Sequence, residues 1–183
     1  AMTSPIIVLV VGESANRHHS QLYGYPLPTT PRQLALKNGK DSLAVFTDIV
    51  SPWNLTSRVF KQIFSLQSVG EKDDWSNYAL FPAVFKKAGY HVSFLSNQFP
   101  YGINYTPDWT NNLTGGFFLN HPQLNKQMFD YRNTEIHSFD DELLNDYKHI
   151  YVKDKQPQLI IFHLLGQHFQ YTMRCKDEMK KFG

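Results

Sequence analysis

The feature that most constrains the fold of this chain is an uninterrupted apolar run near its start, Ile6 to Val11, followed at once by Gly12, Glu13 and Ser14. A continuous run of mostly β-branched apolar residues is typical of a strand buried on both faces of a parallel sheet. In sheets of this kind, ligands bind beyond the carboxyl ends of the strands. We therefore expect Glu13 to stand at the edge of a functional site, poised to bind a metal ion.

The rest of the chain alternates between strand-like and helix-like segments. Further strands are predicted over residues 43–49, 91–95 and 158–165, and helices over 31–37, 56–66, 79–88 and 140–151. This rhythm predicts an α/β fold with a mostly parallel sheet covered by helices on both faces. Residues 97–134 are less regular and are expected to form a long surface excursion.

Composition narrows the function classes. A chain of 183 residues with 42% hydrophobic residues can bury one substantial core, so one domain is expected. The net charge of +2, without long runs of either sign, does not indicate a nucleic-acid or membrane-surface partner. The single cysteine, Cys175, rules out a disulfide within the chain and a cysteine-based zinc cluster.

Targeting segments are also missing from the sequence. It contains no signal peptide and no run near the roughly 20 apolar residues that span a bilayer. We interpret residues 1–5 as a cloning remnant and linker, and the chain as a soluble piece whose parent could carry a membrane anchor.

Polar residues follow two of the predicted strands. Glu13 follows the first, and the segment His163-Leu-Leu-Gly-Gln-His168 closes the last. If these strands are neighbours, Glu13 and His168 face one crevice. Between them in the sequence, residues 51–58 turn into a helix and offer hydroxyl groups at its start. Free backbone N–H groups and the helix dipole there favour an anion such as phosphate.

Each of these residues also has an ordinary structural interpretation. Glu13 could merely cap the segment that follows it, and a threonine such as Thr56 is most often a helix N-cap. His163 lies within an apolar strand and is expected to be a core histidine, whereas His168 lies past the strand end, where exposure is expected. Asp140 and Asp141 most simply cap the helix that they precede.

Taken in order, the motifs resemble those of the bacterial phosphoethanolamine transferases. These are inner-membrane enzymes whose periplasmic catalytic domain has the alkaline-phosphatase/sulfatase fold. The motifs are Gly12-Glu13-Ser14, Arg17, Leu22-Tyr23-Gly24-Tyr25, Thr29-Thr30-Pro31, the Thr56 loop, and the segment from His163 to His168. The resemblance runs through nearly all 183 residues and implies that residues 1–183 are part of a sulfatase-like catalytic domain facing the periplasm.

The resemblance implies roles for five residues. Glu13 and Thr56 are expected to bind zinc, and Thr56 to be the nucleophile that attacks the phosphorus of phosphatidylethanolamine. This leaves a phosphoethanolamine–threonine intermediate, whose group passes to lipid A, a core sugar or a periplasmic glucan. His168 would help to bind substrate or an additional zinc, and Asn97 and Gln98 would line the substrate pocket. Zinc suits this chemistry because it stabilises an alkoxide and withdraws charge from phosphoryl oxygens.

The sequence departs from the family pattern at one point. The family completes its zinc site with an Asp-His pair in a segment resembling Ser-Asp-His-Gly-Glu, and no Asp-His dipeptide occurs in this chain. Glu13 and Thr56 supply only two of the four ligands that zinc prefers. We therefore expect the chain to end partway through the catalytic domain, to bind zinc weakly and to be inactive by itself, with the membrane segments lying elsewhere in the parent.

Three other functions are compatible with parts of this pattern. A true sulfatase needs a Cys/Ser-x-Pro-x-Arg motif, which neither Cys175 nor the Thr56 loop provides. A phosphoglycerol transferase of the lipoteichoic-acid type shares the fold and the threonine nucleophile, but Leu22-Tyr23-Gly24-Tyr25 argues against it. The parent could also be a degenerate member that acts only as a binding module, and an Asp-His pair in its remaining sequence would argue against that.

Overall fold

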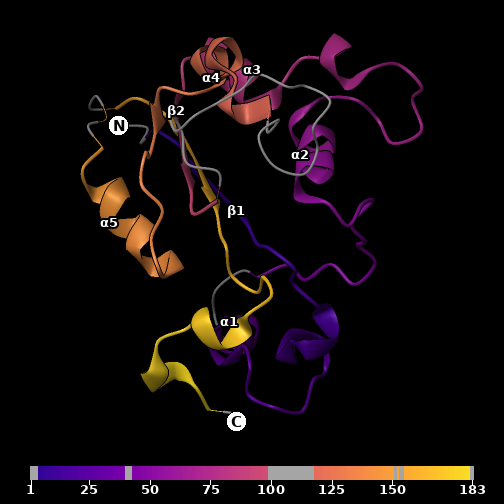
Figure 1. The fold of residues 1–183 in the computed structure, drawn as a ribbon, viewed down its shortest axis with the longest axis vertical. Helices are drawn as coiled ribbons and strands as arrows, with labels where there is room; N and C mark the ends of the chain where they lie inside the picture. Colours follow the sequence, from indigo (N-terminus) through magenta and orange to yellow (C-terminus); the bar gives the residue numbers. More distant parts are fainter. Residues whose placement is uncertain (1–3, 40–42, 99–117, 151, 153–154, 182–183) are drawn as a thin grey trace. The chain divides into compact units, whose positions relative to one another are not determined.

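The computed structural model of the protein describes residues 4–39, 43–98, 118–150, 152 and 155–181. The chain forms two compact units, traced in Figure 1. One consists of Ala1–Glu13 together with Trp53–Gly183, and the other of Ser14–Pro52. The first unit contains the sheet and every residue for which a site role is predicted. A single sulfatase-like domain over residues 1–183 stays a prediction.

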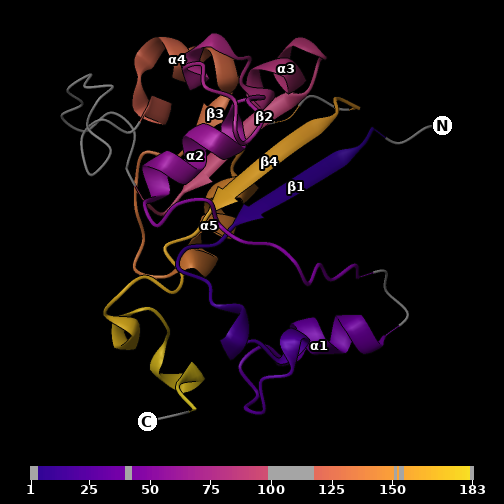
Figure 2. The same ribbon diagram turned by 90° about the vertical axis from the view of Figure 1, so that its right-hand side faces the viewer.

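The sheet has four strands in the order β1 (Ile6–Val11), β4 (Gln158–His163), β2 (His91–Ser96) and β3 (Tyr131–Arg132). All three strand pairs are parallel. Val11 lies opposite His163, and His163 lies opposite Ser96. The carboxyl ends of β1, β4 and β2 therefore meet at one edge of the sheet (Figure 2).

Helices cover both faces of this sheet, which confirms the predicted fold class. Helices α2 (Thr56–Phe64), α3 (Phe81–Lys87) and α4 (Pro122–Met128) contribute to the core on one face, and α5 (Leu143–Lys148) packs on the other. Successive side chains of β2 alternate between the two cores, because the side-chain period of a strand is two. Phe94 lies in the first core and Leu95 in the second.

The second unit is built around α1 (Pro31–Asn38), which begins with a proline as predicted. The side chain of Thr30 ties the preceding turn to this helix, because its Oγ1 accepts a hydrogen bond from the backbone N–H of Gln21 at 3.0 Å. Gly24 ends a short 3-10 helix at a φ of 90°, a conformation that glycine adopts without strain.

Short 3-10 helices complete the described secondary structure. They comprise Arg17–His19, Gln21–Tyr23, Trp75–Asn77, Phe118–Asn120, Asp140–Glu142, Tyr171–Met173 and Asp177–Met179.

The strand predicted over residues 43–49 is wrong. The described residues 43–50 have no regular structure, although they are rich in strand-forming types. Backbone carbonyls here accept hydrogen bonds from side chains instead of from a neighbouring strand: Tyr23 Oη donates to Phe46 O, and Arg17 Nη1 to Thr47 O. Residues with a high strand propensity form no sheet when no partner strand lies beside them.

The prediction that Ile6–Val11 is buried on both faces is also wrong. β1 is an edge strand of the described sheet, and Ile6, Val8 and Val10 are 60%, 53% and 57% exposed. Only Leu9 and Val11 pack against the first core, and the second core contains no residue of β1. A continuous apolar run indicated the strand correctly but carried no information about its place in the sheet.

The predicted surface excursion over residues 97–134 is wrong where the structure describes it. Residues 99–117 of this excursion lie outside the described residues, but Phe118, Leu119 and Met128 are fully buried. The segment also supplies α4 and the strand β3. These elements have seven and two residues, which is too short to show a period in the sequence.

Candidate active site at the carboxyl edge of the sheet

Three of the predicted site residues meet at the carboxyl edge of the sheet. The hydroxyl of Thr56 donates to Glu13 Oε2 at 2.8 Å, and Gln98 Nε2 donates to the same oxygen at 3.3 Å. Gln98 Nε2 also donates to the carbonyl oxygen of Leu164 at 2.8 Å. Glu13 follows β1, Gln98 follows β2 and Leu164 follows β4, so three parallel strands deliver these groups to one point.

Thr56 is not the N-cap of its helix, so that ordinary interpretation is wrong. The N-cap is Leu55, and no side chain caps this helix end. The backbone N–H groups of Arg58 and Val59 both donate to Leu55 O. Since Thr56 Oγ1 makes no capping bond, its hydroxyl can be directed at the carboxylate of Glu13.

His163 is a neutral core histidine, as expected. It is fully buried, its ring lies 4.5 Å from that of Phe60, and burial lowers the pKa of His163 to about 4. Ser96 Oγ donates its single proton to the carbonyl of Gln98, and Nδ1 of His163 lies 2.8 Å from the same hydroxyl oxygen. The network therefore assigns the ring proton to Nδ1, which donates to Ser96. Through Ser96, His163 supports the backbone of Gln98.

Asn97 is buried and uses both ends of its amide within the protein. Its Nδ2 donates to Asp140 Oδ1 at 3.0 Å, and its Oδ1 accepts from the backbone N–H of His137 at 2.6 Å. The described contacts bring Asn97 to Asp140 rather than to Glu13. A role for Asn97 in lining the substrate pocket stays a prediction.

Asp140 is the residue at this edge that sequence reasoning missed. The expectation that Asp140 caps this helix is wrong: the N-cap of the 3-10 helix Asp140–Glu142 is Phe139, and Asp140 lies in its first turn with its carboxylate bonded elsewhere. Oδ1 accepts from the backbone N–H of Leu165 at 2.9 Å, and Oδ2 from that of Gly166 at 2.7 Å. These partners lie 25 and 26 residues away in the sequence, so no local pattern could have indicated them.

His168 lies in the loop that follows β4. Its backbone N–H donates to Leu165 O at 3.1 Å, and its ring packs on that of Phe169, with 4.1 Å between the centroids. The ring Nδ1 is buried and finds no hydrogen-bond partner among the described residues. A nitrogen in this state suits a ligand, but no described contact joins His168 to Glu13 or Thr56, and its role in substrate binding stays a prediction.

Glu13 and Thr56 fit two positions of a zinc site. Their oxygens are 2.8 Å apart, and both carboxylate and alkoxide oxygens are zinc ligands. Among the described residues, no group of three or more histidine, cysteine, aspartate or glutamate side chains could hold a metal ion. Within the same residues, no helix is long and apolar enough to cross a membrane.

The fold and the geometry of this site together define a class of protein. A parallel sheet covered on both faces, with a hydroxyl directed at a carboxylate beyond its strand ends, is the architecture of an α/β enzyme. Residues 5–183 match the sequence model of the family described as Sulfatase. The chain therefore belongs to the sulfatase family.

Curated relatives show which members of this family the chain is similar to. The chain is 30% identical over 179 residues to phosphoethanolamine transferase EptC of Escherichia coli O18:K1:H7, and 31% identical over 182 residues to phosphoethanolamine transferase CptA of Salmonella typhimurium. Each comparison covers 96% of this chain and 29% of the relative, so the chain spans less than a third of the length of these relatives. The resemblance to phosphoethanolamine transferases is confirmed.

Solved structures agree with these relatives. The C-terminal periplasmic domain of EptC from Escherichia coli, in complex with zinc, matches with a TM-score of 0.74 and 26% identity, over 97% of this chain and 48% of that one. The corresponding domain of EptC from Campylobacter jejuni matches with a TM-score of 0.71 at 23% identity, over 100% of this chain and 52% of that one, and shows the shared fold.

Proposed function

We propose that the protein containing these residues transfers phosphoethanolamine from phosphatidylethanolamine to lipid A, a core sugar or a periplasmic glucan. The observation that carries the proposal is the 2.8 Å hydrogen bond from the Thr56 hydroxyl to Glu13, at the first residue of α2. The names of the curated relatives favour this transfer over that of phosphoglycerol, and over a non-catalytic binding module.

In the first half of the reaction, the Thr56 oxygen forms a bond to phosphorus and the bond from phosphorus to the diacylglycerol oxygen breaks. Glu13 Oε2 orients the hydroxyl and is placed to accept its proton, which ends on the diacylglycerol oxygen. Backbone N–H groups at the start of α2 and the positive end of the helix favour the phosphate charge beside Thr56.

In the second half, the hydroxyl of the acceptor attacks the same phosphorus and the Thr56 oxygen leaves. The acceptor proton returns to Thr56, so the enzyme regains its first state. Gln98 Nε2 donates to the same Glu13 oxygen and would keep it in place in both halves, because the carbonyl of Leu164 also accepts from this amide nitrogen. His168 and Asn97 would contribute on the substrate side.

Zinc is the proposed cofactor, and Glu13 and Thr56 would hold it. When bound, the ion would lower the pKa of the threonine hydroxyl and offset negative charge on the phosphoryl group. The zinc complex of the Escherichia coli EptC domain supports this choice of metal. We further propose that the catalytic domain faces the periplasm, on a protein held in the inner membrane by segments outside this chain.

The decisive variant is Thr56→Ala in the complete membrane enzyme. We expect it to lower transfer from a fluorescent phosphatidylethanolamine by more than about 10⁴-fold, as the loss of a catalytic nucleophile does in other enzymes. The thermal midpoint should change little, because the hydroxyl contributes no core packing.

Thr56→Ser is the matched control. It keeps the oxygen that attacks phosphorus, so it should retain measurable transfer and the phosphorylated intermediate. Transfer by Thr56→Ala at a rate near that of the unmodified enzyme would exclude Thr56 as the nucleophile.

A further inference from the structure

We propose that Asp140 is a positioning residue of the candidate active site, whose carboxylate holds the loops after β2 and β4 in register with Glu13. Asp140 would act on Glu13 and Thr56 through the residues that lie between them. The expected effect of Asp140 on turnover depends on the proposed function, whereas its expected effect on the two loops does not.

The carboxylate of Asp140 joins two loops that are far apart in the sequence. Its two oxygens accept three hydrogen bonds, from the backbone N–H groups of Leu165 and Gly166 and from the amide of Asn97, at 2.7 to 3.0 Å. All three donors are uncharged, and a charged acceptor makes such bonds shorter and stronger. One half-buried side chain thus fixes the loop after β2 to the loop after β4.

The first route from Asp140 to Glu13 runs through the loop after β4. A Cβ placed on Gly166 would lie 3.8 Å from Glu13 O and 3.9 Å from Glu13 N, so the residue whose N–H Asp140 binds lies next to the backbone of Glu13. Leu164 extends this contact, because its N–H donates to Val11 O at 2.9 Å.

The second route runs through the loop after β2. Asp140 binds the side chain of Asn97, and the next residue, Gln98, donates to Glu13 Oε2 at 3.3 Å. The carbonyl of Leu164 accepts the other bond from the Gln98 amide, at 2.8 Å. The two routes therefore meet at Leu164 and Glu13, and a shift of either loop moves the carboxylate to which Thr56 donates.

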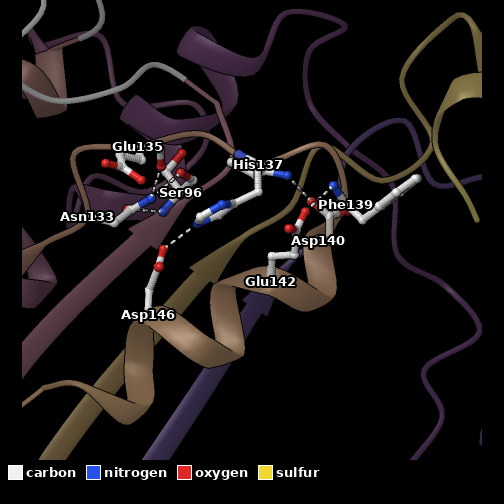
Figure 3. A network of polar contacts seen from close by, with 9 residues as sticks. Ser96, Asn133, Glu135, His137, Phe139, Asp140, Glu142 and Asp146 are labelled. Atoms are coloured by element: carbon white, nitrogen blue, oxygen red, sulfur yellow. Dashed lines mark hydrogen bonds and ion pairs between the residues drawn. The ribbon is translucent and has the colours of Figure 1, made fainter.

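Asp140 is itself held firmly. It precedes Leu143, which is fully buried in the second core and anchors α5. Figure 3 shows that the ring of His137 points toward Asp146 of α5, with Nε2 and Oδ2 2.7 Å apart. Since the backbone N–H of His137 donates to Asn97 Oδ1, both ends of the Asn97 amide are tied to the segment around α5.

The test uses Asp140→Asn with Asp141→Asn as the matched control. An asparagine offers one acceptor oxygen and turns an NH₂ group toward donors, so it cannot satisfy the three N–H groups that Asp140 binds. The neighbouring Asp141 is exposed and pairs with Lys176 at 2.6 Å, so the control makes the same change of charge outside the two loops.

The first measurement is amide hydrogen exchange of Leu165 and Gly166 by NMR in this chain. We expect Asp140→Asn to speed both rates by about tenfold, in line with the loss of a hydrogen bond to a charged acceptor, while Asp141→Asn leaves them unchanged. Unchanged exchange in a folded Asp140→Asn variant would overturn the proposal.

If Asp140→Asn fails to fold, Asn97→Ala answers the same question. It removes one of the three donors and leaves Leu165 and Gly166 on the carboxylate. We then expect the backbone N–H of Gln98 to exchange faster, while those of Leu165 and Gly166 stay protected. Unchanged protection of the Gln98 backbone N–H would overturn the proposal.

The second measurement is steady-state transfer by the complete enzyme. We expect Asp140→Asn to lower kcat by about 100-fold, a loss typical of displaced catalytic groups, with KM for the lipid donor within about twofold. Asp141→Asn should leave both constants unchanged. A normal kcat for Asp140→Asn would overturn the positioning role, whereas active Thr56→Ala would overturn the proposed function and leave the exchange result to decide the role of Asp140.

Discussion

His163 packs against the rings of Phe60 and Phe94, and its Nδ1 lies 2.8 Å from the hydroxyl oxygen of Ser96. Burial in this aromatic setting disfavours the imidazolium, which explains why the pKa of His163 falls to about 4 from the ordinary value of 6.5. Near pH 6 the imidazole of His163 therefore binds a proton in the unfolded chain but not in the folded chain.

This difference predicts acid sensitivity. The contribution of His163 to the free energy of unfolding is fully present above pH 6.5 and is lost progressively as the pH falls toward 4. Between pH 7 and pH 4.5 the loss should reach about 2 kcal/mol, at 1.36 kcal/mol for each unit of pKa shift. Urea unfolding at several pH values should show a flatter pH dependence for His163→Gln, and no change for the exposed control His149→Gln. An unaltered slope for His163→Gln would contradict this assignment.

At the scale of elements, α2 places Thr56 because its inner face is anchored four residues apart. Phe60 and Phe64 pack against each other and against Phe94 of β2, with ring centroids 5.1 to 6.3 Å apart. The apolar spacing over residues 56–66 predicted this helix correctly, because one buried stripe at a period of 3.6 residues is what an amphipathic helix requires.

Alanine substitution measures how much the buried side chains of α2 contribute to the free energy of unfolding. Phe64 is fully buried, so Phe64→Ala should lower the free energy of unfolding by about 3 to 5 kcal/mol. The adjacent Ile63 is 41% exposed, and Ile63→Ala should cost about 1 kcal/mol or less. Urea denaturation of both variants checks the difference, and equal losses would show that the predicted inner face is not the one that holds the helix.

Other elements show where sequence reasoning reaches its limit. The strands at 6–11, 91–96 and 158–163 were predicted within two residues, because each is a dense apolar run bounded by polar residues. The segment 43–49 has the same local character but no partner strand in the described structure. The strand β3 has two residues, and only its pairing with β2 makes it a strand.

At the scale of the whole molecule, one side of β1 is unusual because it exposes apolar side chains in a row. Ile6, Val8 and Val10 point to the same side of the sheet as Ile160 and Phe162, because β1 and β4 are parallel and in register. The second core covers Ile160 and Phe162 but does not extend over β1. β1 pairs only with β4 among the described strands, so this surface lies beside an open strand edge.

We therefore expect this chain to self-associate through β1 at high protein concentration. Val8→Lys places a charge in the middle of the exposed surface and should shift sedimentation velocity profiles toward the monomer. Val69→Lys, at another exposed valine outside β1, is the matched control and should leave the profiles unchanged. Equal association of the Val8→Lys variant and the unmodified chain would rule out β1 as the contact.

The sequence by itself determined the class of fold, the principal strands and helices, and Glu13, Thr56 and Gln98 as candidates for one site. It could do so because dense apolar runs and helical spacing are local, and because the ordered motifs resemble those of phosphoethanolamine transferases. Only the tertiary structure decided that Thr56 donates to Glu13 instead of capping its helix, that Asp140 clamps two distant loops, and that β1 lies at an edge. The physical reason is that hydrogen-bond partners 25 to 43 residues apart, and the neighbours of a strand, are set by how the chain packs and leave no local pattern.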